Sequence, residues 1–208
     1  MKELVKQVYN IRDICKEYDK KLKEVLKIKN SVKDSRIDCF AMIFNQATLA
    51  FELLDFYYGR WNNPPIKENE ERCMAISKML FIASISSIEF SVKKSILLYP
   101  KSELCKFYLE KQKNDKFVSF YEIITRKSKH FITEEDKQSW EFLITIRNAT
   151  VHNNSISDKS REIKINGRKL RIKKDEMMQG KLDHYIFLTI EAIKRYYYWT
   201  KEFDKNCN

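Results

Sequence analysis

Residues that interrupt a regular backbone are rare along this chain. Its 208 residues include three glycines and three prolines, whereas soluble proteins use about 7% glycine and 5% proline. These two residues are the strongest helix breakers, so their scarcity favours long, uninterrupted helices. Hydrophobic residues make up 43% of the sequence, which is enough to form a core between such helices.

Apolar residues recur at helical spacing in several stretches. In residues 2–28, Leu4, Val8 and Ile11 follow one another at intervals of four and three, which places them on one side of a helix. The same spacing or apolar character predicts further helices over residues 36–58, 70–98, from 102 onward, 118–124, 133–152 and 175–204. The five long stretches, with one of the two short ones at 102 and 118–124, predict an all-α bundle of five to six helices that forms a single domain over residues 1–208.

Residues 161–173 have the pattern of strands instead. Asn166-Gly167 suits a two-residue hairpin turn, because both turn residues need a positive φ. Such a turn pairs Ile165 with Arg168 and gives the hairpin one apolar and one charged face. The apolar face carries Ile163, Ile165, Leu170 and Ile172, and the charged face carries Glu162, Lys164, Lys169 and Arg171. We expect this β-hairpin as an insertion at residues 159–174, before the last long helix.

The chain is strongly basic, with a formal net charge of +11 and a pI of about 9.3. Residues 159–174 contain eight basic residues and one acidic residue, so a net of +7 lies in the expected hairpin. Such a balance favours nucleic acid as a partner first and an anionic membrane surface second. The alternative is a basic surface without a specific partner.

The cysteines predict a cytoplasmic protein. All five are scattered, and none forms a CxxC pair or a Cys/His cluster with zinc spacing, so we expect reduced thiols and no metal. The first thirteen residues lack the apolar segment of a signal peptide. The most apolar run, Met79–Ile88, contains three serines and is too short to span a bilayer, so we expect no membrane partner.

The stretch RNATVHNN, residues 147–154, ends the helix that Thr133 and the following acids are expected to begin. Arg147, Asn148 and His152 are suited to cleaving RNA without a metal, because the 2′-OH of RNA can itself attack the adjacent phosphorus. Histidine titrates near neutral pH and can take the 2′-OH proton. Arginine can stabilise the charge that develops on the phosphate, and Asn148 can orient either group.

Helix geometry sets a condition on these three residues. Asn148 and His152 are four residues apart and nearly aligned, whereas Arg147 and His152 differ by about 140° around the helix axis. Both can face one pocket only if the helix ends or distorts near His152. The pair Asn153-Asn154 favours an end there, because asparagine tolerates the left-handed conformation of a C-cap.

This arrangement resembles the HEPN superfamily, helical proteins found among bacterial toxins and anti-phage defence systems. The family signature is an arginine, usually a polar residue after it, and a histidine a few positions later at the end of a long helix; Arg147, Asn148 and His152 fit it. The resemblance implies a metal-independent endoribonuclease that needs no cofactor and works as a homodimer with a composite site. It also implies a toxin or phage-defence role, with RNA and an antitoxin or defence protein as partners. Asn154 replaces the tyrosine of many toxin members.

Cleavage also needs a general acid for the leaving 5′-oxygen. His130 and His184 are candidates in the same chain. A two-fold dimer would instead supply a second His152, since an isologous interface repeats each residue.

Further residues have two interpretations each. Glu89 is a candidate neighbour of Arg147, which can otherwise pair with Glu141 or another acid. The hairpin is expected to contact RNA phosphates, although it can also be a solvated edge; the residues concerned are Lys164, Arg168, Lys169 and Arg171. The run Tyr196–Trp199 suits the core and a dimer interface better than stacking on bases.

Three functions therefore remain open at the level of sequence. The first is a homodimeric ribonuclease that yields a 2′,3′-cyclic phosphate or 3′-phosphate and a 5′-hydroxyl. The second is a non-catalytic HEPN-like module that binds RNA or a protein partner, and the third is a purely structural helical dimer.

Overall fold

The computed structural model describes residues 2–26, 34–59, 66–114, 116, 118–128, 130–152, 156–178 and 181–207. Over these residues it has six α-helices, one π-helix and one two-stranded hairpin. The elements are α1 (Lys2–Val25), α2 (Ser35–Gly59), α3 (Ile66–Ile96), α4 (Glu103–Lys113), η1 (Glu122–Lys127), α5 (Glu134–His152), β1 (Arg161–Ile165), β2 (Arg168–Ile172) and α6 (Leu182–Cys207). The expected helical bundle with a hairpin before its last long helix is confirmed.

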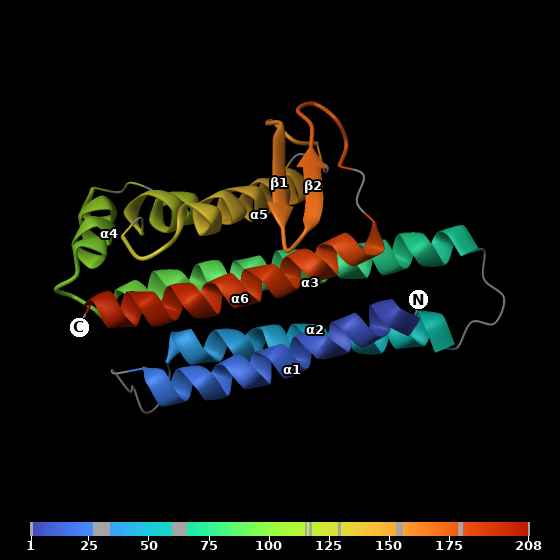
Figure 1. Ribbon diagram of the computed structural model, residues 1–208, viewed down its shortest axis with the longest axis horizontal. Helices are drawn as coiled ribbons and strands as arrows, with labels where there is room; N and C mark the ends of the chain where they lie inside the picture. Colours follow the sequence, from blue (N-terminus) through green and yellow to red (C-terminus); the bar gives the residue numbers. More distant parts are fainter. Residues whose placement is uncertain are drawn as a thin grey trace.

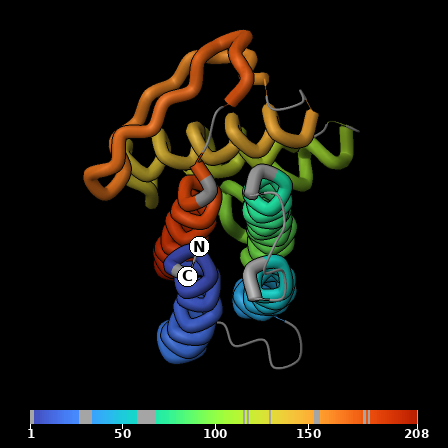
Figure 2. The backbone as a smooth tube through the Cα atoms, turned by 90° about the vertical axis from the view of Figure 1, so that its right-hand side faces the viewer, coloured from blue at the N-terminus to red at the C-terminus, as the bar shows by residue number. Residues whose placement is uncertain are grey.

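Four long helices, α1, α2, α3 and α6, pack side by side as a bundle (Figure 2). Helix α5 lies across α3 and α6 on one side of this bundle, and the hairpin stands beside α5 with its turn toward α6 (Figure 1). Helix α3 contacts α2, α4, α5 and α6, which makes it the central element of the fold. The side of α3 that faces its neighbours includes the small residues Ser77, Ser84, Ser91 and Ser95, which allow other helices to approach closely.

The hairpin has the register that its sequence predicts. Ile165 pairs with Arg168 and Ile163 with Leu170, and both turn residues have a positive φ, 47° at Asn166 and 79° at Gly167. The two faces also separate as expected: Ile165, Leu170 and Ile172 are buried and Ile163 partly so, whereas Glu162, Lys164, Lys169 and Arg171 are exposed. The Asn-Gly turn and the alternation of apolar and charged residues were thus sufficient to predict this hairpin.

The expected start of the last helix at Asp175 is wrong, because α6 begins at Leu182. The chain after β2 is instead held to the segment that follows α5. Ser157 forms a bridge with Lys174, and its carbonyl accepts a hydrogen bond of 2.8 Å from the backbone N–H of Asp175. Asp175 has a φ of 59°, which a helix cannot continue through.

Smaller differences concern the other helix ends. Helix α3 begins at Ile66, four residues earlier than expected, and α1 ends at Val25 rather than at residue 28. The segment expected as a helix over residues 118–124 contains the start of the π-helix η1. Asn153 and Asn154, which we expected to end α5, lie outside the described residues, although α5 does end at His152.

A buried charged cluster ties the ends of three helices together. Arg36, at the start of α2, is fully buried, and its Nε lies 2.8 Å from Oδ1 of Asp34. Its Nη1 lies 2.9 Å from Oδ1 of Asp204, near the end of α6. The hydroxyl of Tyr99, just after α3, hydrogen-bonds both Arg36 and Asp204. Burial, together with the hydrogen bond to Asp204, raises the pKa of Tyr99, so the phenol stays neutral.

The aromatic run in α6 belongs to the core. Tyr196, Tyr197 and Trp199 are buried, whereas Tyr198 is 54% exposed. The indole of Trp199 donates a hydrogen bond of 3.0 Å to the Ser128 hydroxyl. Three of the four rings are therefore used for packing, as expected.

All five cysteines are free, and four of them are buried. Burial raises the pKa of the Cys39 thiol to about 12, so this thiol stays protonated and unreactive at neutral pH.

Two helices have the length and apolar composition of membrane spans, over Ser35–Tyr57 and Glu68–Ile96. The Met79–Ile88 run is only part of the second of these helices. Core helices of water-soluble proteins can have the same length and composition, and α3 is the central helix of this bundle. The absence of a membrane partner stays a prediction.

Candidate active site

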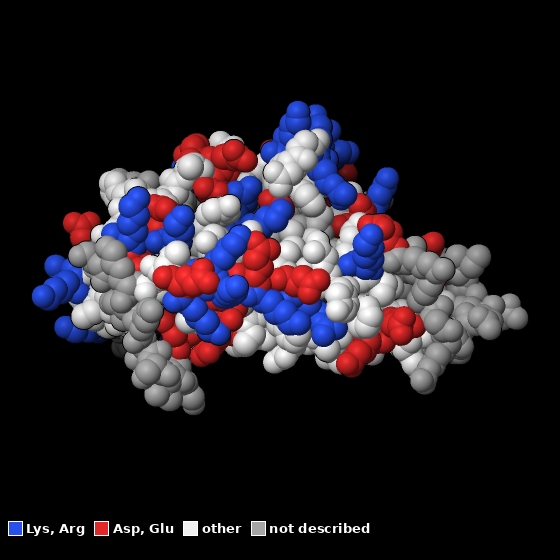
Figure 3. All heavy atoms as spheres, turned by 60° about the horizontal axis from the view of Figure 1, so that its bottom comes forward, with Lys and Arg blue, Asp and Glu red and all other residues white. Residues whose placement is uncertain are grey.

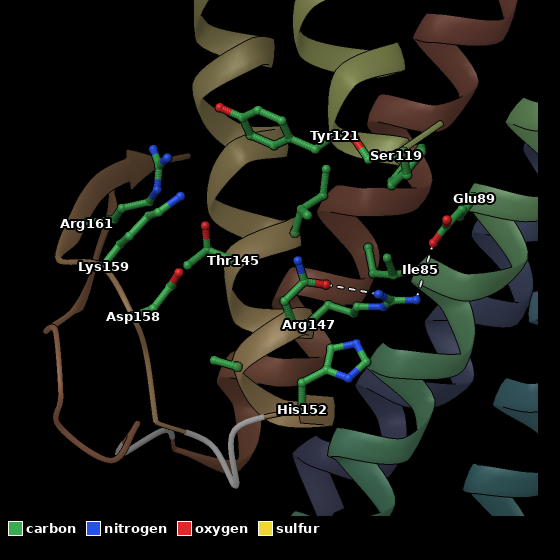
Figure 4. A pocket seen from close by; sticks show the side chains of 14 residues that line it. Ile85, Glu89, Ser119, Tyr121, Thr145, Arg147, His152, Asp158, Lys159 and Arg161 are labelled. Atoms are coloured by element: carbon green, nitrogen blue, oxygen red, sulfur yellow. Dashed lines mark hydrogen bonds and ion pairs between the residues drawn. The ribbon is translucent and has the colours of Figure 1, made fainter. Parts of the chain in front are cut away.

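A cavity of about 440 Å³ lies where α3, α5 and the start of the hairpin meet. Its walls come from Ile85 and Glu89 of α3, from residues 119–121, from α5 and from residues 158–161. Arg147, Asn148 and His152 all line it, as Figure 4 shows. The three residues of the sequence motif therefore share one cavity, and α5 ends at His152, which is the condition that helix geometry sets for Arg147 and His152 to face it together.

Helix α5 carries these residues, and a side-chain cap at Thr133 fixes where it begins. The Thr133 hydroxyl accepts a hydrogen bond of 3.1 Å from the backbone N–H of Asp136, and it donates one of 2.7 Å to the Asp136 carboxylate. This cap satisfies an N–H that would otherwise lack a partner at the helix start. Trp140, Leu143 and Ile146 then bury one side of the helix, and the motif lies along its partly exposed side.

Arg147 is held from two sides. Its Nη1 donates to Oδ1 of Asn148 at 2.9 Å, and its Nη2 donates to Oε2 of Glu89 at 3.2 Å. The other carboxylate oxygen of Glu89 accepts a hydrogen bond of 2.6 Å from Lys93. The expected proximity of Glu89 and Arg147 is confirmed, and Asn148 orients the arginine rather than the histidine.

His152 is the last residue of α5 and is exposed. Its ring lies on the same side of the helix as the Arg147 guanidinium (Figure 4). Within the part of the chain that the structure describes, no group hydrogen-bonds this ring. Both ring nitrogens are therefore open to a ligand in the cavity.

The other two histidines lie elsewhere. His130 lines a separate cavity beside Trp199, and His184 lines a pocket under the hairpin, where its Nδ1 accepts a hydrogen bond of 3.3 Å from Lys181 N–H. Neither lines the cavity of His152. A general acid from within the same chain is therefore not provided by these two residues.

Glu141 does not pair with Arg147, which was one alternative. It binds the opposite wall of the cavity, where Arg161 Nη1 lies 2.7 Å from its Oε2 and the Tyr121 hydroxyl donates to its Oε1 at 2.8 Å. Burial would raise the pKa of the Glu141 carboxyl, but the hydrogen bonds from Tyr121 and Arg161 outweigh burial and lower it. The carboxylate thus stays charged and anchors both side chains.

Sequence reasoning missed the residues of this second wall, namely Tyr121, Asp158, Lys159 and Arg161. The basic run 159–174 included Lys159 and Arg161 but gave no reason to separate them from the rest of the hairpin. For Arg161 the alternation along the strand did carry information. Arg161, Ile163 and Ile165 are two residues apart, so they share the inward side of β1.

The four hairpin residues expected to contact RNA do not line this cavity. Lys164, Lys169 and Arg171 are exposed on the outer side of the hairpin. Arg168 faces inward, where its Nη1 lies 2.9 Å from Oδ2 of Asp183 and its guanidinium lies 4.7 Å from the centre of the Phe187 ring. Figure 3 shows lysines and arginines gathered at the hairpin, whereas acids and bases alternate over the helices.

No group of three or more His, Cys, Asp or Glu side chains in the described ranges is arranged to hold a metal ion. No protein-family model, no curated protein and no solved structure matches this chain.

Proposed function

We propose that this protein is a metal-independent endoribonuclease of the HEPN type that works as a homodimer in the cytoplasm. One observation carries the proposal: a single cavity presents an oriented arginine, its asparagine neighbour and an exposed histidine without a hydrogen-bond partner among the described residues. These are the groups that cleavage by a 2′-OH needs. A role as a toxin or phage-defence effector, with an antitoxin or defence protein as partner, follows from the same resemblance.

In the proposed reaction His152 removes the proton of the 2′-OH, and the 2′-oxygen attacks the adjacent phosphorus. The new P–O2′ bond forms as the P–O5′ bond breaks, which leaves a 2′,3′-cyclic phosphate and a 5′-hydroxyl. Arg147 stabilises the negative charge that develops on the phosphate oxygens. A second histidine gives a proton to the leaving 5′-oxygen, and in a homodimer this is the second copy of His152.

Exposed apolar side chains on α3 and α5 support the dimer. Met79 and Phe90 are 57% and 53% exposed, and their spacing of eleven residues puts them on the same side of α3. Phe90 directly follows Glu89, and the exposed Val151 directly precedes His152. An apolar surface of this kind commonly marks a protein interface, and it lies on the helix that also contributes Ile85 and Glu89 to the cavity.

The basic outer side of the hairpin supports RNA as the polyanion. Lys164, Lys169 and Arg171 are exposed there, near the cavity but not in it. Such side chains bind phosphates without reading sequence and raise the affinity for any RNA strand that reaches the site.

A non-catalytic module that binds RNA or a protein partner is the second candidate. It is favoured by the state of Arg147, both of whose terminal nitrogens already donate to Asn148 and Glu89. A phosphate has to compete with these partners before Arg147 can stabilise a transition state. Cleavage assays distinguish this module from an enzyme.

The first experiment is incubation of a mixed RNA pool with the purified protein in EDTA. The variants Arg147→Ala and His152→Ala remove the proposed groups, and His184→Ala is the matched control because His184 lies in another pocket. We expect wild type and His184→Ala to cut, and Arg147→Ala and His152→Ala to lose at least 100-fold in rate. End analysis should give 2′,3′-cyclic phosphate and 5′-hydroxyl termini.

Two results contradict the proposal. One is cutting by both motif variants at the wild-type rate, which would place the activity elsewhere or in a contaminant. The other is a wild-type protein that forms a dimer and binds RNA but does not cut it, which would favour the non-catalytic module.

A further inference from the structure

The cavity extends well beyond the Arg147–His152 motif. Thr145, Asn148 and His152 line it at intervals of three and four residues along α5, so it follows one side of the helix. At 1.5 Å per residue, the stretch from Thr145 to His152 is about 10 Å long. This length leaves room at the Thr145 end for a part of the ligand that the motif does not touch.

The far end is built around a second arginine. Arg161 and Lys159 lie on the hairpin side of α5, whereas Arg147 lies on the side facing α3 (Figure 4). Lys159 is exposed and forms no ion pair with any residue that the structure describes. Asp158 lies on the same wall, so the cavity surface there carries two positive charges and one negative charge.

The two arginines are held in the same way. Each donates one terminal nitrogen to a helix glutamate, Arg147 to Glu89 at 3.2 Å and Arg161 to Glu141 at 2.7 Å. In each, the Nε atom is buried and has no hydrogen-bond partner among the described residues. A buried donor without an acceptor is costly, and an anchored guanidinium has lost much of the freedom that binding would otherwise remove. Two such groups in one cavity suit a ligand with two anionic positions.

The backbone before the hairpin fixes this wall. Ser157 is fully buried, its hydroxyl donates to the Lys159 carbonyl at 2.7 Å, and it accepts from the Lys159 N–H at 3.2 Å. The Tyr121 hydroxyl shares Glu141 with Arg161. Contacts from Ser157, from Tyr121 and from Glu141 of α5 thus hold this wall in place. A solvated loop without a ligand does not need contacts of this kind.

We infer that Arg161 and Lys159 form a second phosphate-binding position, so that the substrate is a single RNA strand that spans the cavity with two consecutive phosphates. This inference rests on the proposed function for the identity of the ligand. Arg147 contacts the phosphate that is cut, and Arg161 with Lys159 contacts its neighbour. An unpaired strand is the form whose backbone can bend into a cavity of about 440 Å³.

The test uses probes that bind but cannot be cut. 2′-O-methyl RNA lacks the attacking hydroxyl, and a dimer of it has one phosphodiester whereas a trimer has two. We expect wild type to bind the trimer roughly tenfold more tightly than the dimer, as one charge-assisted phosphate contact allows. Arg161→Gln should reduce this ratio to about threefold or less, and Lys159→Gln should reduce it partly.

Two controls separate the phosphate contact from other effects. Lys169→Gln removes a cation from the outer side of the hairpin, and should weaken both probes equally. Circular dichroism of Arg161→Gln establishes that the variant is folded.

The outcomes are distinct. If Arg161→Gln leaves the ratio of the affinities for the three- and two-nucleotide probes unchanged, the second phosphate position is overturned, whether or not the protein cuts RNA. A ratio that depends on Arg161 in a protein that never cuts RNA supports the second position and contradicts the ribonuclease. A wild type that binds both probes equally, or neither, also overturns the second position.

Discussion

Arg147 of α5 and Glu89 of α3 form an ion pair across two helices, with 3.2 Å between Nη2 and Oε2. The carboxylate is shared with Lys93 and is partly buried, so it fixes the guanidinium in the cavity while reducing its net charge. The pair can therefore act on the reaction in two opposite ways, by holding the arginine in place or by competing with the phosphate.

Replacing Glu89 by glutamine tests which effect dominates. We expect Glu89→Gln to lower kcat roughly tenfold with little change in KM, because a loosely held arginine stabilises the transition state less well. Single-turnover and steady-state cleavage rates measure this. Glu68→Gln is the matched control, since it neutralises a glutamate about 30 Å away along the same helix. A rise in kcat would mean that Glu89 restrains the enzyme instead.

The dimer can be tested on the apolar side of α3. Phe90→Glu should give a monomer and abolish cleavage, because it places a charge in the proposed interface and removes the second His152 from the site. Size-exclusion chromatography with light scattering measures the mass. Leu49→Glu is the control, as Leu49 is similarly exposed, at 55%, but lies on α2. A Phe90→Glu dimer with full activity would rule out this surface as the interface.

The outer side of the hairpin should act through charge alone. Each phosphate contact on a single strand contributes about 0.7 to the slope of log affinity against log salt, so removing three cations should lower that slope by about 2. The triple variant replaces Lys164, Lys169 and Arg171 by glutamine. The control replaces three exposed lysines of α1 by glutamine, namely Lys20, Lys21 and Lys23. Equal slopes for the two variants would show that the hairpin has no special part in RNA binding.

The buried Arg36 should be critical for stability. Arg36→Met leaves the carboxylates of Asp34 and Asp204 buried without their cation, which should cost about 3 to 5 kcal/mol in the free energy of unfolding. Urea denaturation followed by circular dichroism measures it. Lys23→Met breaks an exposed pair with Asp19 and should cost less than about 1 kcal/mol. Similar losses in the two variants would contradict the structural role of the cluster.

Glu141 should make stability depend on pH in acid. Its pKa is lowered in the folded protein, so its contribution is fully present above the unfolded value of about 4.3 and is lost as pH falls through the folded pKa. We expect wild type to exceed Glu141→Gln in unfolding free energy at pH 7, and the difference to shrink toward pH 3. Glu17→Gln, at an exposed position, should show little change. A difference that is constant over this range would mean that the carboxylate is not specially stabilised.

The features that sequence alone predicted well are local ones. The Asn166-Gly167 turn sets its own pairing within a few residues, and the cap at Thr133 involves only Asp136, three positions later. RNATVHNN is equally local, because its residues follow one another on a single helix. Glu89 was a candidate because a lone acid in an apolar helix needs a partner, and the family resemblance pointed to Arg147 as that partner.

The features that sequence did not predict depend on distant pairings. Tyr121 and Arg161 each lie 20 residues from Glu141, and each has many other carboxylates within reach in an unfolded chain. Only the packing of α5 against the hairpin selects Glu141. The late start of α6 is a similar case, because Ser157 holds Lys174 and Asp175 from a distant part of the chain, which no local pattern indicates.

The hairpin is fastened at both of its ends. At its base Arg161 is joined to Glu141 of α5, and at its tip Asn166 donates to Glu191 of α6 at 2.8 Å while Arg168 pairs with Asp183. The hairpin therefore connects the two helices. If α6 tilts relative to α5, either one of these contacts breaks or Arg161 moves with the hairpin and the cavity changes in width. A protein that binds the outer side of α6 would in this way affect the site at a distance.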